Sequence, residues 1–308
     1  MFKKYNSIEN SYRDKYITKA LSQYPELKDE TYCLVEKLDG ANLQLFFQPN
    51  KEMQVGKRSC FISKDEDFYS VWDVLSYYSK MISKFQEIAD TGHVIRVYGE
   101  LYGEGIQKRV KYGHGKHFSF FDVEIDGKML SQLELNALSE DPRLEKIQAP
   151  VLCVVEDLET ALNFNVNFDS RVAGIENNPS EGVIIRPYNK EYTLGNGSRF
   201  ILKKKADSFS EKMKAKPGKK KVEQSAKLIK AKLEFESYIN DNRVSSIFSK
   251  HGIIENEKDI GKYIQMVIAD AKDDFLKDYD ISDLSDKELK KIYSGGGKYI
   301  VSLLRKHL

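Results

Sequence analysis

The chain has few of the residues that are typical of secreted, disulfide-bonded proteins or of proteins with a structural metal site. Its 308 residues include only three cysteines, one tryptophan and seven prolines. Cys33, Cys60 and Cys153 are far apart and form no C-x-x-C pair, so we expect neither disulfide bonds nor a zinc site. A reducing compartment fits this composition best: the cytoplasm, which is the host-cell cytoplasm if a phage or virus encodes the chain.

Long apolar stretches are missing as well. No run approaches the roughly 20 residues that a helix needs to span a bilayer, and the first residues lack the apolar stretch of a signal peptide. We therefore expect no membrane partner. Hydrophobic residues make up 41% of the chain and charged residues 31%, as in globular domains, and the length is sufficient for two of them.

The charges nearly balance, at a net +2, but they are unevenly distributed. Residues 1–202 carry 25 basic and 30 acidic side chains, whereas residues 203–222 carry nine lysines and two acids. Residues 223–308 carry 15 of each sign. The lysine-rich stretch has two interpretations that can both hold: a solvated linker, or a surface that binds nucleic-acid phosphates by releasing counterions.

Apolar patterning predicts a strand-rich α+β first part. The predicted strands cover residues 33–37, 42–47, 94–101, 117–125 and 182–187, and the predicted helices cover 70–89 and 130–138. Asp39-Gly40 lies between the first two strands and predicts a tight hairpin that pairs them.

After Lys205 the pattern becomes helical. Pro217-Gly218 interrupts the lysine run and indicates a linker. Apolar residues then recur at helical spacing, in the sets Ala226/Ile229/Leu233, Ile264/Val267/Ile268/Ala271/Phe275 and Ile300/Leu304/Leu308. We predict an α+β domain over residues 1–213, a linker over 214–222 and an all-helical domain over 223–308.

Six short blocks of the first part point to one chemistry. They are Glu36-Lys37-Leu38-Asp39-Gly40-Ala41-Asn42, Lys57-Arg58, Tyr98-Gly99-Glu100, Phe120-Phe121-Asp122, Ser180-Glu181-Gly182-Val183 and Leu202-Lys203-Lys204-Lys205. A nucleophilic lysine, an acid, an aromatic, a second acid and a lysine pair are what nucleotidyl transfer needs. Each block alone occurs by chance in many proteins. Their order makes the prediction specific.

Lys37 is the candidate nucleophile, because it ends a predicted strand and precedes a turn that holds its backbone. To attack phosphorus, its amine must lose a proton near neutral pH, although a free lysine has a pKa of about 10.4. Nearby cations favour that loss, namely a magnesium ion and the lysines of the last block. The alternative for an isolated K-x-D-G is an exposed turn lysine.

Glu100 and Glu181 end strands in glycine-rich surroundings, where one acid suits a ribose hydroxyl and the other a divalent metal. Each is otherwise a surface acid. Phe121 suits stacking on a purine face, and its alternative is a place in the core. Strand alternation predicts that Asp122 points to the face opposite Phe121.

Alternation also predicts how the last block is arranged. Lys203 and Lys205 should lie on one side of a strand, where both can grip a phosphate and stabilise its transition state. Lys204 should point away.

Together the blocks resemble the covalent nucleotidyltransferases, the superfamily of nucleic-acid ligases and messenger-RNA capping enzymes. The chain is most similar to the RNA ligase 2 family, the double-strand RNA ligases of T-even phages and the kinetoplastid editing ligases. Stretches outside the blocks extend the likeness: Met1-Phe2-Lys3-Lys4-Tyr5, Gly105-Ile106-Gln107-Lys108, Phe209-Ser210-Glu211-Lys212 and Ile247-Phe248-Ser249-Lys250. The resemblance implies an antiparallel-sheet nucleotidyltransferase domain, an ATP-grasp-like ligase adenylation domain, followed by a small all-helical RNA-binding domain.

The resemblance also implies a role for each site residue. Lys37 would carry AMP, Glu100 would hold ribose hydroxyls and Phe121 would stack on adenine. Catalysis would use Lys37, Lys203 and Lys205, and Glu181 would bind or orient the metal. The nucleotide would also contact Glu36, Asn42 and Arg58. The residues that would support the site are Asp39, Lys57, Gln107 and Asp122. One position departs from the pattern, since phage members carry histidine where this chain has Asp39, and the role of Asp39 stays open.

These features predict an ATP-dependent RNA ligase that uses Mg²⁺ or Mn²⁺, binds RNA as nicked duplex and acts as a monomer. One alternative is a DNA ligase or capping enzyme, which would carry an oligonucleotide-binding barrel after Lys205, where this sequence is predicted to be helical. The other is a catalytically silent RNA-binding protein on the same fold. Such a protein is expected to lack Lys37, Glu181 or Lys205, and all three are present.

Overall fold

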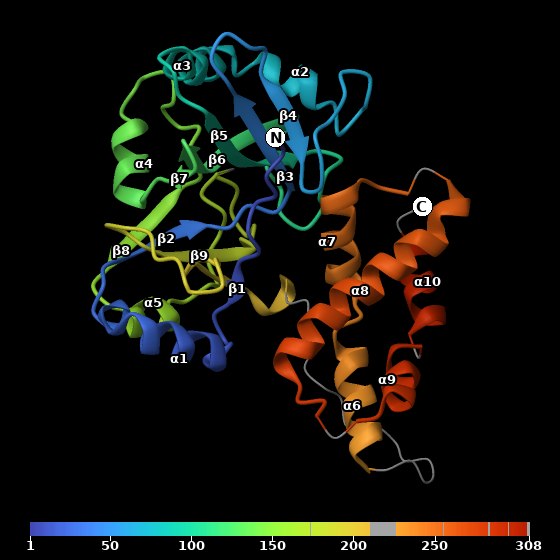
Figure 1. Ribbon diagram of the computed structural model, residues 1–308. Coiled ribbons are helices and arrows are strands. Elements are labelled where there is room, and N and C mark those ends of the chain that lie inside the picture. The colour runs from blue at the N-terminus through green and yellow to red at the C-terminus, as the bar shows by residue number, and fades with distance from the viewer. Residues whose placement is uncertain (173, 210–225, 255, 283, 295, 307–308) are drawn as a thin grey trace. The chain divides into compact units, whose positions relative to one another are not determined.

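The computed structural model describes residues 1–172, 174–209, 226–254, 256–282, 284–294 and 296–306. Its internal contacts divide the chain into two units, Met1–Ala206 and Asp207–Leu308. The linker predicted over residues 214–222, the start of the predicted helical domain and Leu308 lie outside the described residues. Figure 1 shows the elements of each unit.

Two five-stranded sheets form the framework of the first unit. The order in the first sheet is β1-β10-β9-β2-β8, and in the second β4-β3-β5-β6-β7. The strands are β1 (Glu9–Asn10), β2 (Tyr32–Glu36), β3 (Ala41–Phe47), β4 (Gln54–Lys57), β5 (Ile95–Gly103), β6 (Lys116–Ile125), β7 (Lys128–Met129), β8 (Val151–Val155), β9 (Gly182–Pro187) and β10 (Leu202–Lys205). All neighbours are antiparallel except β1 and β10, which confirms the predicted antiparallel α+β class.

Helices cover one face of each sheet, and the opposite faces carry both polar and apolar residues, such as Gln44 and Phe46 of β3. The helices of this unit are α1 (Asp14–Gln23), α2 (Val71–Ser76), α3 (Ser79–Asp90), α4 (Gln132–Leu138) and α5 (Leu158–Asn163), with a short 3₁₀ helix η1 (Pro25–Lys28). Side chains of α1 and α5 pack on the first sheet, and those of α2 and α3 pack on the second, as Figure 1 shows.

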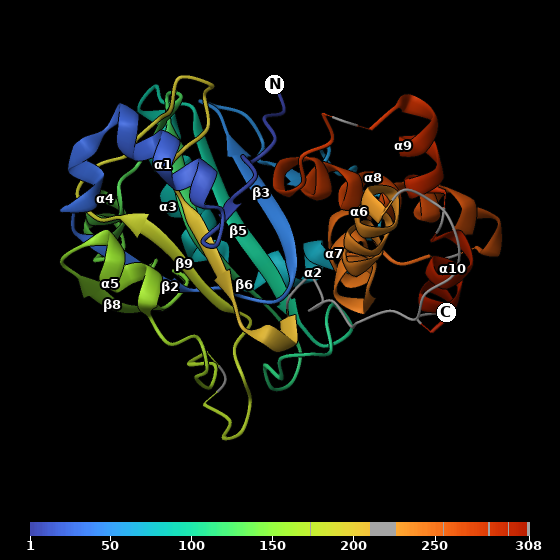
Figure 2. The ribbon, with the colours of Figure 1, turned by 90° about the horizontal axis from the view of Figure 1, so that it is seen from below.

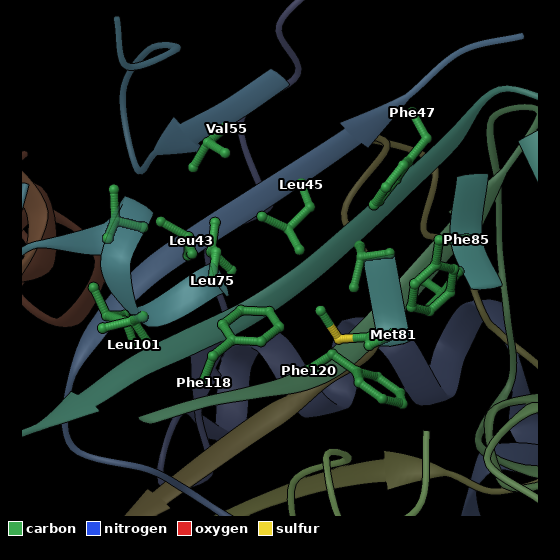
Figure 3. Packing of buried hydrophobic residues seen from close by; sticks show 14 of the residues in the cluster. Leu43, Leu45, Phe47, Val55, Leu75, Met81, Phe85, Leu101, Phe118 and Phe120 are labelled. Atoms are coloured by element: carbon green, nitrogen blue, oxygen red, sulfur yellow. The ribbon is translucent and has the colours of Figure 1, made fainter. Parts of the chain in front are cut away.

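Alternation along the second sheet separates its core from its polar face. Figure 3 shows Leu43 and Leu45 of β3 and Phe118 of β6 on the side of α3, where Met81 and Phe85 pack against the sheet. The three long strands β3, β5 and β6 run side by side in Figure 2. Residues that alternate with the core positions therefore face away from α2 and α3.

The hairpin predicted at Asp39-Gly40 is wrong. Strand β2 pairs with β8 and β9, whereas β3 pairs with β4 and β5, so the turn carries the chain from one sheet to the other. Gly40 is required there by close packing, because a Cβ on it would lie 2.3 Å from the carbonyl oxygen of Leu101. The turn residues permit a reversal, but burial of all five residues of β2 favours a place inside a sheet.

The other strand predictions are confirmed closely. Strand β9 has the predicted bounds, and β5 and β6 differ from the predicted strands by one or two residues at their ends. The helix predicted over residues 70–89 is two helices, because α2 ends at Ser76 and α3 begins only at Ser79.

The second unit is helical over its described residues. It contains η2 (Asp207–Phe209), α6 (Ala226–Ser237), α7 (Asp241–His251), η3 (Glu257–Asp259), α8 (Ile260–Asp278), α9 (Asp286–Tyr293) and α10 (Gly297–Arg305). Val267, Ala271 and Phe275 of α8 lie in its core with Ile300 and Leu304 of α10, as the periodicity predicts. No helix in the described part of the chain is long and apolar enough to cross a bilayer.

Helix α6 is present where a helix is predicted, but two of the apolar residues that indicate it are not in the core. Leu228, Ala231 and Phe235 are buried, whereas Ile229 and Leu233 are 36% and 44% exposed. Apolar residues recur at helical spacing on both sides of this helix, so periodicity alone does not determine which side is buried.

Phe85 tests the packing of the second sheet. Phe85→Ala is expected to lower the free energy of unfolding of the first unit by about 3–5 kcal/mol, because it leaves a cavity under β3 and β6. The matched control is Tyr77→Ala, which removes a side chain that is 86% exposed and should cost less than about 0.5 kcal/mol. Urea unfolding followed by the fluorescence of Trp72, the single tryptophan and a neighbour of this core, reports on the unit. Equal losses in the two variants would contradict the assigned core.

Candidate active site

A buried carboxylate shared by two lysines lies at the centre of the site. The Nζ of Lys37 lies 2.6 Å from Oε2 of Glu181, and the Nζ of Lys205 lies 2.9 Å from Oε1. Strand pairing brings the three together: the amide of Lys37 donates to the carbonyl of Gly182, and Lys205 pairs with Gly182 across β10 and β9. Two lysines from separate blocks therefore bind the carboxylate of a residue from a third block.

The lysines determine the charge of Glu181. Burial would raise its pKa, but the ammonium groups of Lys205 and Lys37 outweigh burial and lower the pKa of Glu181 to about 2. The carboxylate is thus ionised at neutral pH, and it holds both amines in place. The side chain of Lys37 is 22% exposed, so the site is open to solvent at this residue.

Gly182 allows β9 and β10 to approach closely at this point. Its φ is +140°, and a Cβ on it would lie 2.1 Å from the carbonyl oxygen of Lys204. Any larger residue would push β10, and Lys205 with it, away from Glu181. This contact explains why glycine follows Glu181 in the fifth block.

Lys204 lies on the side of β10 that alternation predicts. The Nζ of Lys204 donates to the carbonyls of Leu162 and Phe164, away from Glu181, and burial lowers the pKa of Lys204. Lys203 lies two residues before Lys205 on the same strand, where its carbonyl accepts from the amide of Ser11.

Asp39 lies in a polar contact network beside this centre. It is 2% exposed, and its carboxylate oxygens accept from Nη2 and Nε of Arg109 at 2.5 and 3.1 Å. Its amide donates to the hydroxyl of Tyr112 at 2.7 Å. Burial and the neighbouring Glu181 raise the pKa of Asp39, and Arg109 opposes this shift.

The second sheet contributes Glu100 and Asn42. They are partners in the register of β3 and β5, and both alternate with residues of the buried core. Burial raises the pKa of Glu100 to about 8, and its charged neighbours include Lys37, Glu181 and Arg58. The site therefore draws its side chains from both sheets, and burial favours the protonated form of Glu100.

Phe121 and Asp122 do not point to opposite faces, so the alternation predicted for them is wrong. Tyr98 pairs with Asp122 and Gly99 pairs with Phe120, which leaves Phe121 as an extra residue in β6. Such a β-bulge puts two successive residues on one side. Both contact Tyr5: its ring lies 5.2 Å from that of Phe121, and its hydroxyl donates to Asp122 at 2.6 Å.

Asp122 is the centre of a second buried charge network. It is fully buried and accepts from Arg199 at 2.6 Å, while Arg186 lies 3.2 Å away. Burial alone would raise the pKa of Asp122, but the two guanidinium groups hold it below its usual range. Arg186 also donates to the carbonyl of Phe121 at 3.2 Å, so the network fixes the backbone that carries this aromatic ring.

Glu36 is buried one residue before Lys37. Its Oε2 accepts from the amide of Arg171 at 3.0 Å, and its Oε1 is buried without a hydrogen-bond partner among the described residues. Burial raises the pKa of Glu36. Ser170 and the amide of Arg171 oppose this shift, so Glu36 is held by the segment that precedes β9.

The remaining predicted residues, Lys57, Arg58 and Gln107, belong to the second sheet and its loops. The Nζ of Lys57 lies 2.5 Å from a carboxylate oxygen of Glu66. Arg58 reaches the hydroxyl of Ser7 at 3.5 Å, and its charge favours the ionised form of Glu100. Gln107 is partly buried in the loop between β5 and β6. Arg58 is thus linked to the site through its charge interaction with Glu100. Lys57 instead forms its ion pair with Glu66.

Sequence reasoning missed the arginines that pair with the buried acids. Arg186 lies in the apolar run of β9, where an isolated charge already indicates a buried partner. Arg109 directly follows Gln107-Lys108, and Arg199 lies in a loop without a distinctive pattern. Spacing along the chain could not show which acid each of them meets.

Comparison with known proteins agrees with this architecture. The RNA ligase family model matches residues 30–205, more than half of the chain. The model for the T4 RNA ligase 2 C-terminal region matches residues 222–295.

Solved structures with this fold include several of Naegleria gruberi RNA ligase. A glutamate-to-alanine mutant with AMP and Mn has a TM-score of 0.52 and 19% identity, over 68% of this chain and 57% of that one. The same ligase with PPi has a TM-score of 0.50 and 19% identity, over 68% and 57%. The chain thus spans little more than half the length of that ligase, and the likeness concerns the fold. With the family match over residues 30–205, this chain belongs to the RNA ligase family.

Proposed function

We propose that this protein is an ATP-dependent RNA ligase that seals 3′-hydroxyl/5′-phosphate breaks, with nicked duplex RNA as its substrate. The observation that supports this most directly is the carboxylate of Glu181, which holds the Nζ atoms of Lys37 and Lys205 at 2.6 and 2.9 Å. A nucleophilic amine and a second cation are thereby placed side by side. Membership of the RNA ligase family supports the same reaction.

In the first step Lys37 attacks the α-phosphate of ATP. A bond forms between Nζ and phosphorus, the bond to the β-phosphate oxygen breaks, and pyrophosphate leaves. Because the pKa of Glu181 is about 2, its carboxylate orients the amine and is too weak a base to take the proton, which leaves to solvent. Lys205 and Lys203 stabilise the negative charge that grows on the phosphate oxygens.

In the later steps AMP passes from Lys37 to the 5′-phosphate of RNA, and a 3′-hydroxyl then attacks that phosphate and releases AMP. The same lysines serve all three steps, since each step displaces a group from phosphorus in an electrostatically prepared site.

The adenosine is proposed to bind among side chains that come from both sheets. Phe121 stacks on adenine, Glu100 forms a hydrogen bond with a ribose hydroxyl, and Asn42 lies beside Glu100. Glu36 is buried one residue before Lys37 and shapes the pocket around the nucleotide. Arg58 and Lys57 contact phosphate, Gln107 lines the pocket, and Asp122 supports the strand that carries Phe121.

The residues fit a magnesium or manganese ion that is held mainly by its nucleotide. The described residues contain no cluster of three or more metal-ligating side chains, and Mg²⁺ commonly uses one or two carboxylates together with phosphates and waters. Glu181 would orient the hydrated ion, since each of its oxygens faces a lysine amine and each carries two lone pairs. The ion supplies charge neutralisation on the phosphates.

The two units are proposed to have different functions, adenylation and RNA binding. Residues 1–213 form the adenylation domain, 214–222 a lysine-rich linker, and 223–308 a helical RNA-binding domain. We propose that the protein acts as a monomer in a reducing cytoplasm, without zinc. DNA ligases and capping enzymes would place a barrel after Lys205, and the described residues of 226–306 contain no strand.

The nucleophile is tested by covalent labelling. Full-length protein with Mg²⁺ and α-labelled ATP is expected to form an acid-labile, base-stable adenylate on Lys37. Lys37→Ala should abolish it, and Lys37→Arg should too, because a guanidinium stays protonated. Gel analysis of the labelled protein measures this. Undiminished labelling in Lys37→Ala would assign the nucleophile elsewhere.

Strand β10 provides a matched pair of variants, at Lys204 and Lys205. Lys205→Ala should slow adenylation by about 10²–10³, because it removes a charge that stabilises the transition state. Lys204→Ala should change the rate little, since its amine donates to carbonyls on the other side of β10. Single-turnover labelling rates measure both. A larger loss in Lys204→Ala would reverse the assignment of the two faces.

The division of work is tested with a fragment that ends at Lys214. It keeps both hydrophobic cores of the first unit and should still become adenylated, but it should transfer AMP to nicked RNA poorly. Sealing of nicks with RNA or DNA on each side is compared for fragment and full chain at two salt concentrations. Full-length activity should fall with salt as phosphate contacts weaken. A fragment that seals RNA as well as the full chain would rule out this role for the helical unit.

A further inference from the structure

Arg109 lies outside the six blocks, yet its guanidinium is bound to the segment that carries the nucleophile. It belongs to the loop between β5 and β6, and two of its nitrogens meet the two oxygens of Asp39 at 2.5 and 3.1 Å. Its side chain is 22% exposed, whereas that of Asp39 is 3% exposed. A two-point contact of this kind fixes orientation as well as charge.

Asp39 is a buried acid that stays ionised only beside a cation. It lies near Glu181, a second buried carboxylate, and the charges of Arg109 and Lys37 favour its ionised form. Lys37 is two residues away along the chain. If Arg109 were absent, Asp39 would compete with Glu181 for the amine of Lys37.

On the basis of the proposed function, we propose that Arg109 is a positioning residue for adenylation, which holds Asp39 so that Lys37 stays directed by Glu181 toward the α-phosphate. Arg109 acts through Asp39 and does not contact ATP. The hydroxyl of Tyr112 completes the arrangement, because it accepts from the amide of Asp39 at 2.7 Å and fixes the backbone of the turn.

The need for Arg109 follows mainly from the charge of Asp39. Arg109 is also one of the cations that lower the pKa of Glu181, so its loss affects both buried acids. A neutral residue at position 39 removes the charge that Arg109 balances there, and the part of its effect that runs through Asp39 should then disappear.

The test is a double-mutant cycle on the full-length protein, made of wild type, Arg109→Met, Asp39→His and the double variant. The rate of covalent labelling is measured over a range of ATP concentrations. Arg109→Met should lower the maximal rate at least about tenfold and leave the KM for ATP within about twofold. In the Asp39→His background, the same change should cost less than about threefold.

Two further variants serve as controls. Lys108→Met removes the exposed neighbouring cation and should leave the labelling rate unchanged. Arg109→Lys keeps the charge but not the two-point contact, so its rate should lie between those of wild type and Arg109→Met. Thermal unfolding followed by Trp72 fluorescence checks that each variant is folded, and Arg109→Lys replaces Arg109→Met in the cycle if the latter is not.

Equal costs of Arg109→Met in the two backgrounds would overturn the inference, since Arg109 would then act independently of Asp39. A raised KM at an unchanged maximal rate would overturn it too, because it would indicate direct contact with ATP. Loss of labelling in both Asp39→His and Asp39→Asn would show that Asp39 itself is needed, and would also contradict it. Absence of labelling in the wild type, by contrast, would refute the proposed function.

Discussion

The arrangement of the site depends on one buried carboxylate. Glu181 is almost inaccessible to solvent and is ionised because two lysines flank it. A buried ion pair gives little net stability, since desolvation offsets most of the attraction, but removal of one partner leaves an unpaired charge. The fold therefore tolerates this group only with both amines in place, and that requirement aligns β2, β9 and β10 at the position where the proposed chemistry occurs.

The same principle recurs in the rest of the first unit. Asp39 pairs with Arg109, and Asp122 pairs with Arg199 and Arg186. These pairs involve residues far apart in the sequence, and they lie on the polar sides of sheets whose other faces pack against helices. The helices provide hydrophobic stabilisation, while the charge networks determine where each functional side chain lies. Phe121 illustrates this division, because Arg186 binds its carbonyl and Tyr5 contacts its ring.

Local irregularities of the backbone complete the site. The bulge at Phe121 turns two successive side chains toward Tyr5, and Gly182 lets β10 approach β9 closely enough for Lys205 to reach Glu181. An additional carbon atom or a regular register at either place would move a side chain out of the site. Such features cost the sheet some regularity, and functional sites commonly contain them.

By itself, the sequence determined the strand-rich α+β class, the bounds of β9, the side of β10 on which Lys204 lies and the helical second unit, because alternation and helical periodicity are local properties. It also pointed to Lys37, Glu181 and Lys205, through the order of residue types that one reaction needs. The tertiary structure decided what depends on partners distant in the chain. It separated β2 from β3 into different sheets, turned Asp122 to the side of Phe121, chose the buried face of α6 and matched each buried acid with its arginine. Turn propensity, strand alternation and helical spacing describe a few neighbouring residues, whereas these outcomes follow from packing and charge pairing across segments that only the folded chain brings together.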